Sequence, residues 1–436
     1  MPPNRQFQQR REAMPSAILP GQIMSRAELA EAVNQYLWHT KGERREMDAH
    51  TIARYERGVI RWPNDSYREA FRVVLHATDT ELGFTPARRR REQAGQQIGT
   101  AIAELIRPLQ PGVVATDFED LIDWSGKPPT RADWSDVVRV RFATRAAASA
   151  ENKLGGGTAT SLAMQFVHRL GCLVRAQASP AVRRALLEAV GNLSGVAGYA
   201  AFDAGDHATA DRRFRFALAC ADAAGSWELR ASTLADMARR AAYAGDTDAA
   251  LSLIEVAQVR SDRLSATVRA MLSALRAQYL ATMGRGDDAL TEVARADEYF
   301  AGRMPATDAP WLCFYDEAEH LGSTGKALIP VAMATRQIET VAERIGRAVE
   351  LQPADYPRSQ TFSLIRLATI TMQLGDPRAA AELGMRAVEN TGRLDSLRLR
   401  TELRSLAAAA ARHSDVSDAA NLHESISHHT APKAAP

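Results

Sequence analysis

Glycines recur at a near-constant interval through the second half of the 436-residue chain. Taken as turns between helices, Gly205, Gly245, Gly284, Gly322 and Gly375 are separated by 40, 39, 38 and 53 residues. A period of this size is typical of proteins built from repeated supersecondary units, each of which buries its apolar face against a neighbour. The period therefore predicts a helical array over residues 158–427.

Small residues recur at fixed distances from these glycines. Alanine stands five positions and twelve positions after each glycine, and a small residue stands seven positions before four of the five. Small side chains let two helices approach closely, while Phe214, Ile254 and Val293 would fill the space between them. The pattern predicts paired helices, with a fourth unit that has Tyr315 in place of a small residue and an insertion near Gln352 and Pro353.

The array resembles tetratricopeptide repeats, although its units are a few residues longer than that family's. The resemblance implies an α-solenoid whose inner groove binds peptides or partner proteins. It places outward residues of the first helix of each pair in that groove, namely Asn192, Tyr199, Arg239, Gln278, Asp316 and Glu319. The alternative for any one of them is an ordinary solvated or packing role.

The stretch from Met24 to Phe84 carries the signals of three further helices. Ser25 followed by Glu28 predicts a capping box, and the helix that it opens has an apolar side. Asp48 would cap a second helix that ends at Gly58. Asn64 or Asp65 would cap a third. Helices in this order, joined by a polar connection, are typical of a helix-turn-helix.

These segments resemble the helix-turn-helix of the phage-repressor-like (XRE) transcriptional regulators. Residues 25–30, SRAELA, match the first motif helix, and residues 51–58, TIARYERG, match the second helix and its closing turn. Joined to the repeats, the module looks like the actinobacterial regulators of this family that have a tetratricopeptide-like C-terminal half. The connection between Ala30 and Ile52 is about a dozen residues longer than is usual in the family.

The resemblance implies a DNA-binding face made of Arg26, Ala49, His50, Thr51, Arg54, Arg57 and Arg61. Arg54 and His50 could hydrogen-bond base edges, and Ala49 or the Thr51 methyl could touch a thymine methyl. Arg57 and Arg61 would contact phosphates, which fixes register without reading sequence. Because one such module makes few base contacts, the resemblance also implies a homodimer on double-stranded DNA.

Net charge, cysteine content and missing motifs limit the classes of protein to which the chain can belong. The formal net charge is +2, with +4 on residues 1–92 and −2 on the remainder, which is weak support for a basic N-terminal module. Three widely separated cysteines favour reduced thiols in a cytoplasmic protein. We find no signal peptide, no membrane-spanning run, and no catalytic, metal-binding or cofactor-binding pattern. Gly155, Gly156 and Gly157 lack the Lys-Ser/Thr of a phosphate-binding loop and predict a flexible joint.

The expected protein is all-α, with a helix-turn-helix domain at 1–92, a proline-interrupted connector at 93–157, helical repeats at 158–427 and a disordered tail at 428–436. The expected function is sequence-specific regulation of transcription. The repeats would bind a peptide, small ligand or partner protein, would dimerise, or both. The alternative is a protein–protein adaptor whose degenerate helix-turn-helix does not bind DNA. An enzyme is not expected.

Overall fold

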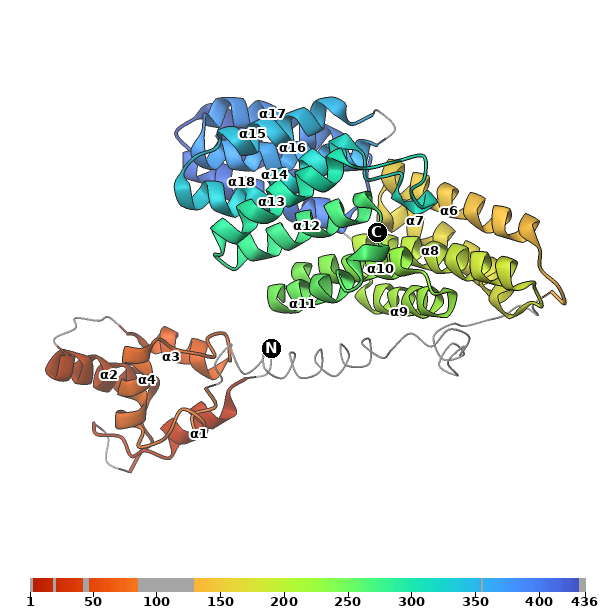
Figure 1. Cartoon of the computed structure of the whole chain (residues 1–436). Coiled ribbons are helices and arrows are strands. Elements are labelled where there is room, and N and C mark those ends of the chain that lie inside the picture. Colours follow the sequence, from red (N-terminus) through yellow and green to blue (C-terminus); the bar gives the residue numbers. More distant parts are fainter. Residues whose placement is uncertain (1–2, 19–20, 42–46, 85–128, 354–355, 431–436) are drawn as a thin grey trace. The chain divides into compact units, whose positions relative to one another are not determined.

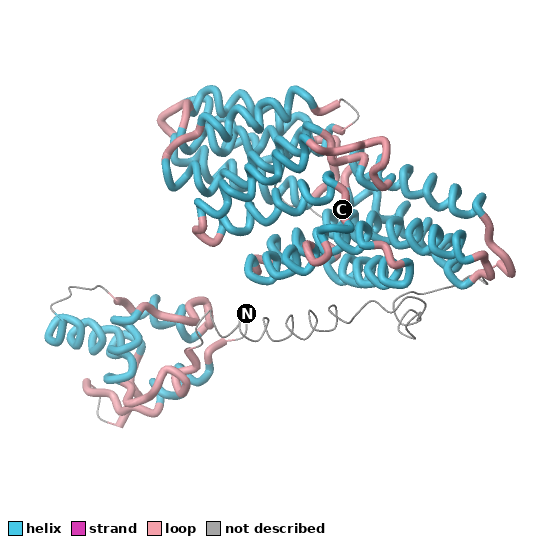
Figure 2. Tube along the Cα trace, viewed as in Figure 1, coloured by secondary structure: helices cyan, strands magenta, loops and turns pink. Residues whose placement is uncertain are grey.

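The computed structural model describes residues 3–18, 21–41, 47–84, 129–353 and 356–430, and these residues are helical with connecting loops (Figure 2). The chain divides into two compact units, Met1–Glu104 and Leu105–Pro436. The first 36 residues of the expected connector, 93–128, lie outside the described residues. Among the helices described, none combines the length and the apolar character needed to cross a membrane.

Unit 1 contains four described helices (Figure 1): α1 Arg5–Glu12, α2 Arg26–Lys41, α3 Ala49–Glu56 and α4 Asp65–Val74. Asn4, Asp48 and Asn64 cap α1, α3 and α4 through their side chains, each accepting a hydrogen bond from a backbone N–H of the first turn. The capping box predicted from Ser25 and Glu28 is present, because each of these residues accepts a hydrogen bond from the other's backbone N–H.

An aromatic cluster forms the centre of unit 1. Phe7 of α1, Tyr55 of α3, Phe71 of α4 and Phe84 are buried, with ring centroids 5.0 to 6.1 Å apart. Several of these pairs meet edge to face, an arrangement that aromatic rings prefer. The cluster therefore packs one side of α3 against α1 and α4 and leaves its other side to solvent.

Unit 2 consists of helices that pack in adjacent pairs (Figure 1). The pairs are α6 Trp134–Leu154 with α7 Gly156–Leu170, α8 Pro180–Ala204 with α9 His207–Ala224, α10 Trp227–Tyr243 with α11 Thr247–Ala257, α12 Ala266–Thr282 with α13 Gly286–Ala301, α14 Glu317–Thr335 with α15 Glu339–Leu351, α16 Pro357–Leu374 with α17 Pro377–Thr391, and α18 Leu397–Ala410 with α19 Ser417–Thr430.

The small residues lie where paired helices approach most closely. A Cβ atom on Gly198 of α8 would come within 2.9 Å of the Phe214 ring of α9, a distance that real Cβ atoms do not show. Ala238, Ala277 and Ala368 occupy the matching places in α10, α12 and α16 and are fully buried. The prediction of helix pairs spaced by small residues is thereby confirmed for these pairs.

The fourth turn was placed wrongly by the sequence pattern. Gly322 lies buried inside α14, and the turn to α15 is made by Arg336, which has a φ of 58°. A left-handed backbone is usually occupied by glycine, so an arginine there gave no signal. The insertion is also elsewhere: it is the loop of residues 302–316 between α13 and α14, rather than a segment near Gln352.

Two boundaries differ from those expected. Helix α6 lies in the segment predicted to be a connector. A helix forms there because the Asp133–Asp136 capping box begins it and its apolar side packs on α8. Helix α19 continues to Thr430, three residues into the predicted disordered tail, and the Thr430 hydroxyl donates to the Ile426 carbonyl. Residues 431–436 lie outside the described part of the chain.

Unit 2 closes on itself, because α16 packs against α6 and α18 packs against α8. The buried Arg358 of α16 forms ion pairs with Asp203 of α8 at 2.6 Å and with Glu151 of α6 at 3.1 Å. Asp203 also accepts hydrogen bonds from the Ser396 hydroxyl and the Gly156 N–H, both at 2.9 Å. This closure network joins residues that are up to 245 positions apart.

The three consecutive glycines belong to this closure and are not a flexible joint. The Gly157 N–H donates to the Asp395 carbonyl at 2.9 Å, and the Asp395 N–H donates to the Leu154 carbonyl at 2.8 Å. A Cβ on Gly155 would lie 2.5 Å from the Asp395 carbonyl oxygen, and one on Gly156 would lie 2.4 Å from the Ala200 carbonyl oxygen. Glycine is therefore required so that the backbones can touch.

Replacing Arg358 with alanine will strongly destabilise unit 2. The substitution removes the ion-pair partner of the buried Glu151 and leaves Asp203 with Arg398, which is 3.9 Å away. Breaking a buried ion pair in this way typically costs about 3–5 kcal/mol. Arg347→Ala is the matched control, because Arg347 forms only an exposed ion pair with Glu350, worth about 0–1 kcal/mol. Urea denaturation followed by circular dichroism measures both, and equal losses in the two variants would contradict this role of Arg358.

Candidate functional site

The outer face of α3 carries the residues predicted to read DNA. Ala49, His50 and Arg54 are exposed and Thr51 is half-buried, whereas Ile52 and Tyr55 face the core. Arg57 and Arg61, which follow the helix, are exposed as well. Six of the seven predicted DNA contacts thus lie on α3 or in the turn after it.

Both ends of α3 are fixed by local hydrogen bonds. Asp48 accepts the Thr51 N–H at 2.7 Å. Hydrogen bonds from the Thr51 side chain and from this N–H hold the pKa of the Asp48 carboxyl below its usual value. At the other end Gly58 has a φ of 71°, and the Val59 N–H returns to the Arg54 carbonyl at 3.0 Å. The predicted cap at Asp48 and the predicted stop at Gly58 are both confirmed.

Arg26, the seventh predicted contact, is held by a buried carboxylate. Glu56 of α3 accepts from Arg26 of α2 at 2.6 Å and from Arg11 of α1 at 2.7 Å. Arg11 also donates to the Met24 carbonyl at 2.6 Å. The Glu56 carboxylate therefore ties the three helices together, and the Arg26 side chain, about half exposed, has its Nε engaged inside the unit.

Hydrogen bonds to α2 hold the end of the long α2–α3 connection that precedes α3. The Asn34 side chain of α2 accepts the Met47 N–H and donates to the Met47 carbonyl, both at 2.9 Å. Residues 42–46 of the connection lie outside the described residues. Because Met47 immediately precedes the cap Asp48, this two-bond contact sets where α3 begins.

Replacing Asn34 with alanine will lower the thermal stability of unit 1. The Met47 backbone loses both hydrogen-bond partners, at a cost of about 1–3 kcal/mol, and exchange of the α3 amide hydrogens should accelerate. Gln35→Ala is the control, because Gln35 bonds only Glu31 on the exposed side of α2. If both variants exchange α3 amides at the same rate, Asn34 does not position the helix.

The first helices of the pairs in unit 2 bring a second set of predicted residues together. Arg239 of α10 forms an ion pair with Asp236 at 2.8 Å. Burial lowers the pKa of Arg239, but Asp236, Tyr199 and Tyr279 outweigh it and raise the pKa overall. Glu319 of α14 also raises the pKa of Arg239. Three residues predicted to share a groove, Tyr199, Arg239 and Glu319, are therefore close enough to interact electrostatically.

Lys326 of α14 belongs to this cluster and was not found from the sequence. Burial lowers its pKa to about 7, and the neighbouring Arg366, Arg398 and Arg239 add to the shift, whereas Glu402 opposes it. Glu402 is held by Arg366 through two hydrogen bonds of 3.0 and 3.1 Å. Its place directly before the apolar run of residues 327–334 in α14 was the only local signal for this position.

Of the remaining predicted groove residues, Asp316, Asn192 and Gln278, Asp316 contacts a member of the cluster through the backbone of Glu319. Asp316 is the N-cap of α14 and accepts the Glu319 N–H at 2.9 Å. Asn192 and Gln278 are half-buried on α8 and α12. Tyr279, which follows Gln278 in the sequence, has a buried hydroxyl near Arg239. This hydroxyl makes no hydrogen bond among the described residues.

Stability should rise with pH because of Lys326. The folded protein releases the Lys326 proton near pH 7 and the unfolded chain near pH 10.5, so the unfolded state binds more protons between these values. Lys326→Met should raise stability at pH 6–7 and flatten the profile up to about pH 10. Denaturation midpoints across this range test it, and an unchanged slope would show that Lys326 titrates normally.

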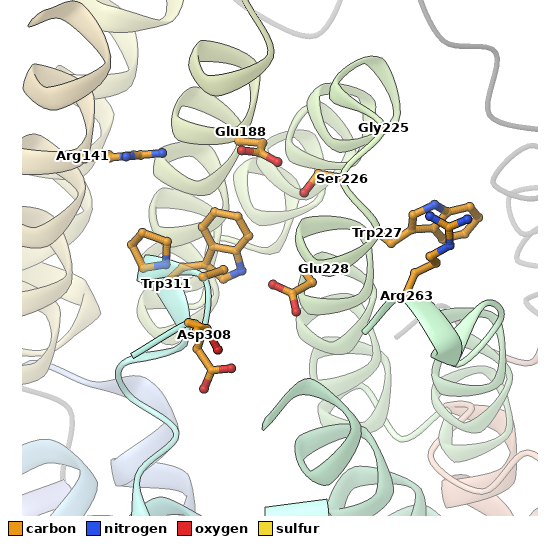
Figure 3. A pocket seen from close by; sticks show the side chains of 12 residues that line it. Arg141, Glu188, Gly225, Ser226, Trp227, Glu228, Arg263, Asp308 and Trp311 are labelled. Carbon is orange, nitrogen blue, oxygen red and sulfur yellow. The ribbon is translucent and has the colours of Figure 1, made fainter. Parts of the chain in front are cut away.

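A separate pocket of about 450 Å³ opens in unit 2. Its lining comes from α6, α8, the start of α10, Arg263 and the long loop before α14, and comprises Arg141, Glu188, Gly225, Ser226, Trp227, Glu228, Arg263, Thr307, Asp308, Ala309, Pro310 and Trp311. Figure 3 shows the Glu188 and Glu228 carboxylates facing the space beside the Trp311 ring, with Asp308 below it. The sequence pattern did not predict this pocket.

Neither unit contains a described group of three or more side chains that could hold a metal ion. Cys172 and Cys220 are buried and Cys313 is exposed, and all three are free thiols. No protein-family model matches the chain, and no curated protein matches its sequence.

Proposed function

We propose that the protein is a sequence-specific DNA-binding transcriptional regulator. Unit 1 acts as a helix-turn-helix in which α2 braces the fold and α3 enters the major groove. The observation that carries the proposal is the exposed face of α3, with His50 and Arg54 flanked by Arg57 and Arg61. A helix of this size fits the major groove, where Arg and His can donate to base edges.

The roles of the basic residues follow from their surroundings. Arg54 has its side chain exposed in the last turn of α3 and reads a base. Arg57 and Arg61 lie beyond the helix and bind phosphates. We assign Arg26 to positioning, because its Nε is already bonded to Glu56 and fixes α2 to α3.

Unit 2 serves as the sensing and assembling half of the regulator. Its paired helices and small-residue contacts support the resemblance to tetratricopeptide repeats, and its pocket and charged cluster offer places for an effector. An apolar stripe on α6 supports a homodimer: Trp134, Val138 and Phe142 recur at every fourth residue and are 54, 61 and 68% exposed. Exposed stripes of this kind are typical of interaction surfaces.

Replacing Arg54 with alanine will weaken the preferred DNA site by about 1–3 kcal/mol, because a bidentate base contact is lost. Arg57→Ala should instead weaken preferred and unrelated DNA alike and reduce the slope of log affinity against log salt by about one. Fluorescence anisotropy with the full chain measures both. An Arg54→Ala variant with unchanged sequence preference would remove Arg54 from the reading face, and no salt-dependent binding at all would refute the proposed function.

A further inference from the structure

The long loop between α13 and α14 is where unit 2 departs most from its regular connections. The turns after α8, α9 and α12 have two or three residues, whereas this loop runs from residue 302 to 316. Loops of such length in compact arrays usually have a function. The loop is fastened back onto the array, because the Thr267 hydroxyl of α12 donates to Asp308.

The fastened loop makes one wall of the pocket and supplies Asp308 and Trp311 to it. The opposite walls come from α6, α8 and the start of α10, which supply Arg141, Glu188 and Glu228. Trp227 and Arg263 also line the pocket, and their side chains lie beside each other (Figure 3). The pocket thus combines segments from five separate parts of unit 2 around one space.

The charges in the pocket are not balanced within the protein. Glu228 accepts the Ser265 N–H at 2.8 Å, Asp308 accepts the Thr267 hydroxyl, and Glu188 has no hydrogen-bond partner among the described residues. None of these three carboxylates forms an ion pair in the described part of the chain. Two guanidinium groups of the lining, those of Arg141 and Arg263, oppose these three carboxylates, and Arg263 also lies 3.5 Å from Asp262.

Trp311 adds an aromatic wall and an unused donor. Its ring stands beside the space between Glu188 and Glu228 (Figure 3), and its indole N–H is shielded from solvent and makes no hydrogen bond. An aromatic face next to carboxylates attracts organic cations, because the ring quadrupole and the negative charges act in the same direction.

We propose that this pocket binds a small organic cation, with its ammonium or guanidinium group held between Glu188, Glu228 and Asp308 and its chain against Trp311. The ligand class is that of aliphatic amines and guanidines. Glu188 is the main counter-ion, since it alone of the three carboxylates has no hydrogen-bond partner among the described residues. The proposal supplies an effector class for the proposed regulator, but the binding itself does not depend on DNA recognition.

Isothermal titration calorimetry of the full chain at low salt tests the proposal without DNA. Putrescine and agmatine should bind, whereas butane-1,4-diol, which has the same chain length as putrescine but no charge, should not. Glu188→Gln should weaken binding about tenfold or more, because a charge-assisted hydrogen bond is lost. This variant should fold normally, since no partner of Glu188 is removed.

Glu382→Gln is the matched control, because Glu382 is an exposed helical carboxylate on α17, away from the pocket lining. It should bind putrescine like the unaltered chain. Equal binding of the amine and the diol, or equal loss in the Glu188 and Glu382 variants, would overturn the proposal, because either result means that the carboxylates attract cations only as general surface charge. DNA binding measured on the same samples reports on the proposed function separately.

Discussion

The buried ion pairs of Arg358 are the interaction on which the shape of unit 2 depends. Two carboxylates, Asp203 and Glu151, lie in the interior because this guanidinium pairs with both of them. Asp203 is further compensated by the Gly156 N–H, the Ser396 hydroxyl and Arg398, which is 3.9 Å away. Burial and the neighbouring Asp203 raise the pKa of Glu151, whereas Arg358 outweighs burial and lowers that of Asp203. Since the partners come from α6, α8 and α16, the network can form only when nearly the whole array is in place. The ends of unit 2 therefore stabilise each other, unlike those of an open repeat array, whose units contact only their neighbours.

In unit 1, too, a buried carboxylate that pairs with arginine holds helices in place. Glu56 is buried between Arg11 and Arg26 and fixes the end of α3, while Asn34 fixes its beginning through Met47. These long-range bonds explain how α3 keeps a defined place in spite of the long connection before it. The residues that hold α3 and the residues that it exposes are different sets, so the exposed set is free to contact a partner.

The sequence predicted features that depend on neighbours along the chain. The Ser25–Glu28 box, the Asp48 cap, the Gly58 stop and the exposed positions of α3 all follow from local rules, and all are present. The repeat period located most turns but failed at Arg336, where the left-handed residue is not glycine. The closure network, Lys326 and the pocket could not be predicted, because their members meet only through tertiary packing. The position of the long loop was missed for the same reason, and with it Asp308 and Trp311.

Selection of bound fragments from a random pool of double-stranded DNA, using the full chain, tests the central claim that unit 1 reads sequence. The account predicts one enriched motif made of two inverted half-sites, as a homodimer with one α3 in each major groove requires. Repeating the selection with Arg54→Ala should relax preference at one position of each half-site. A pool that stays random after several rounds, while the protein remains folded, would contradict the claim.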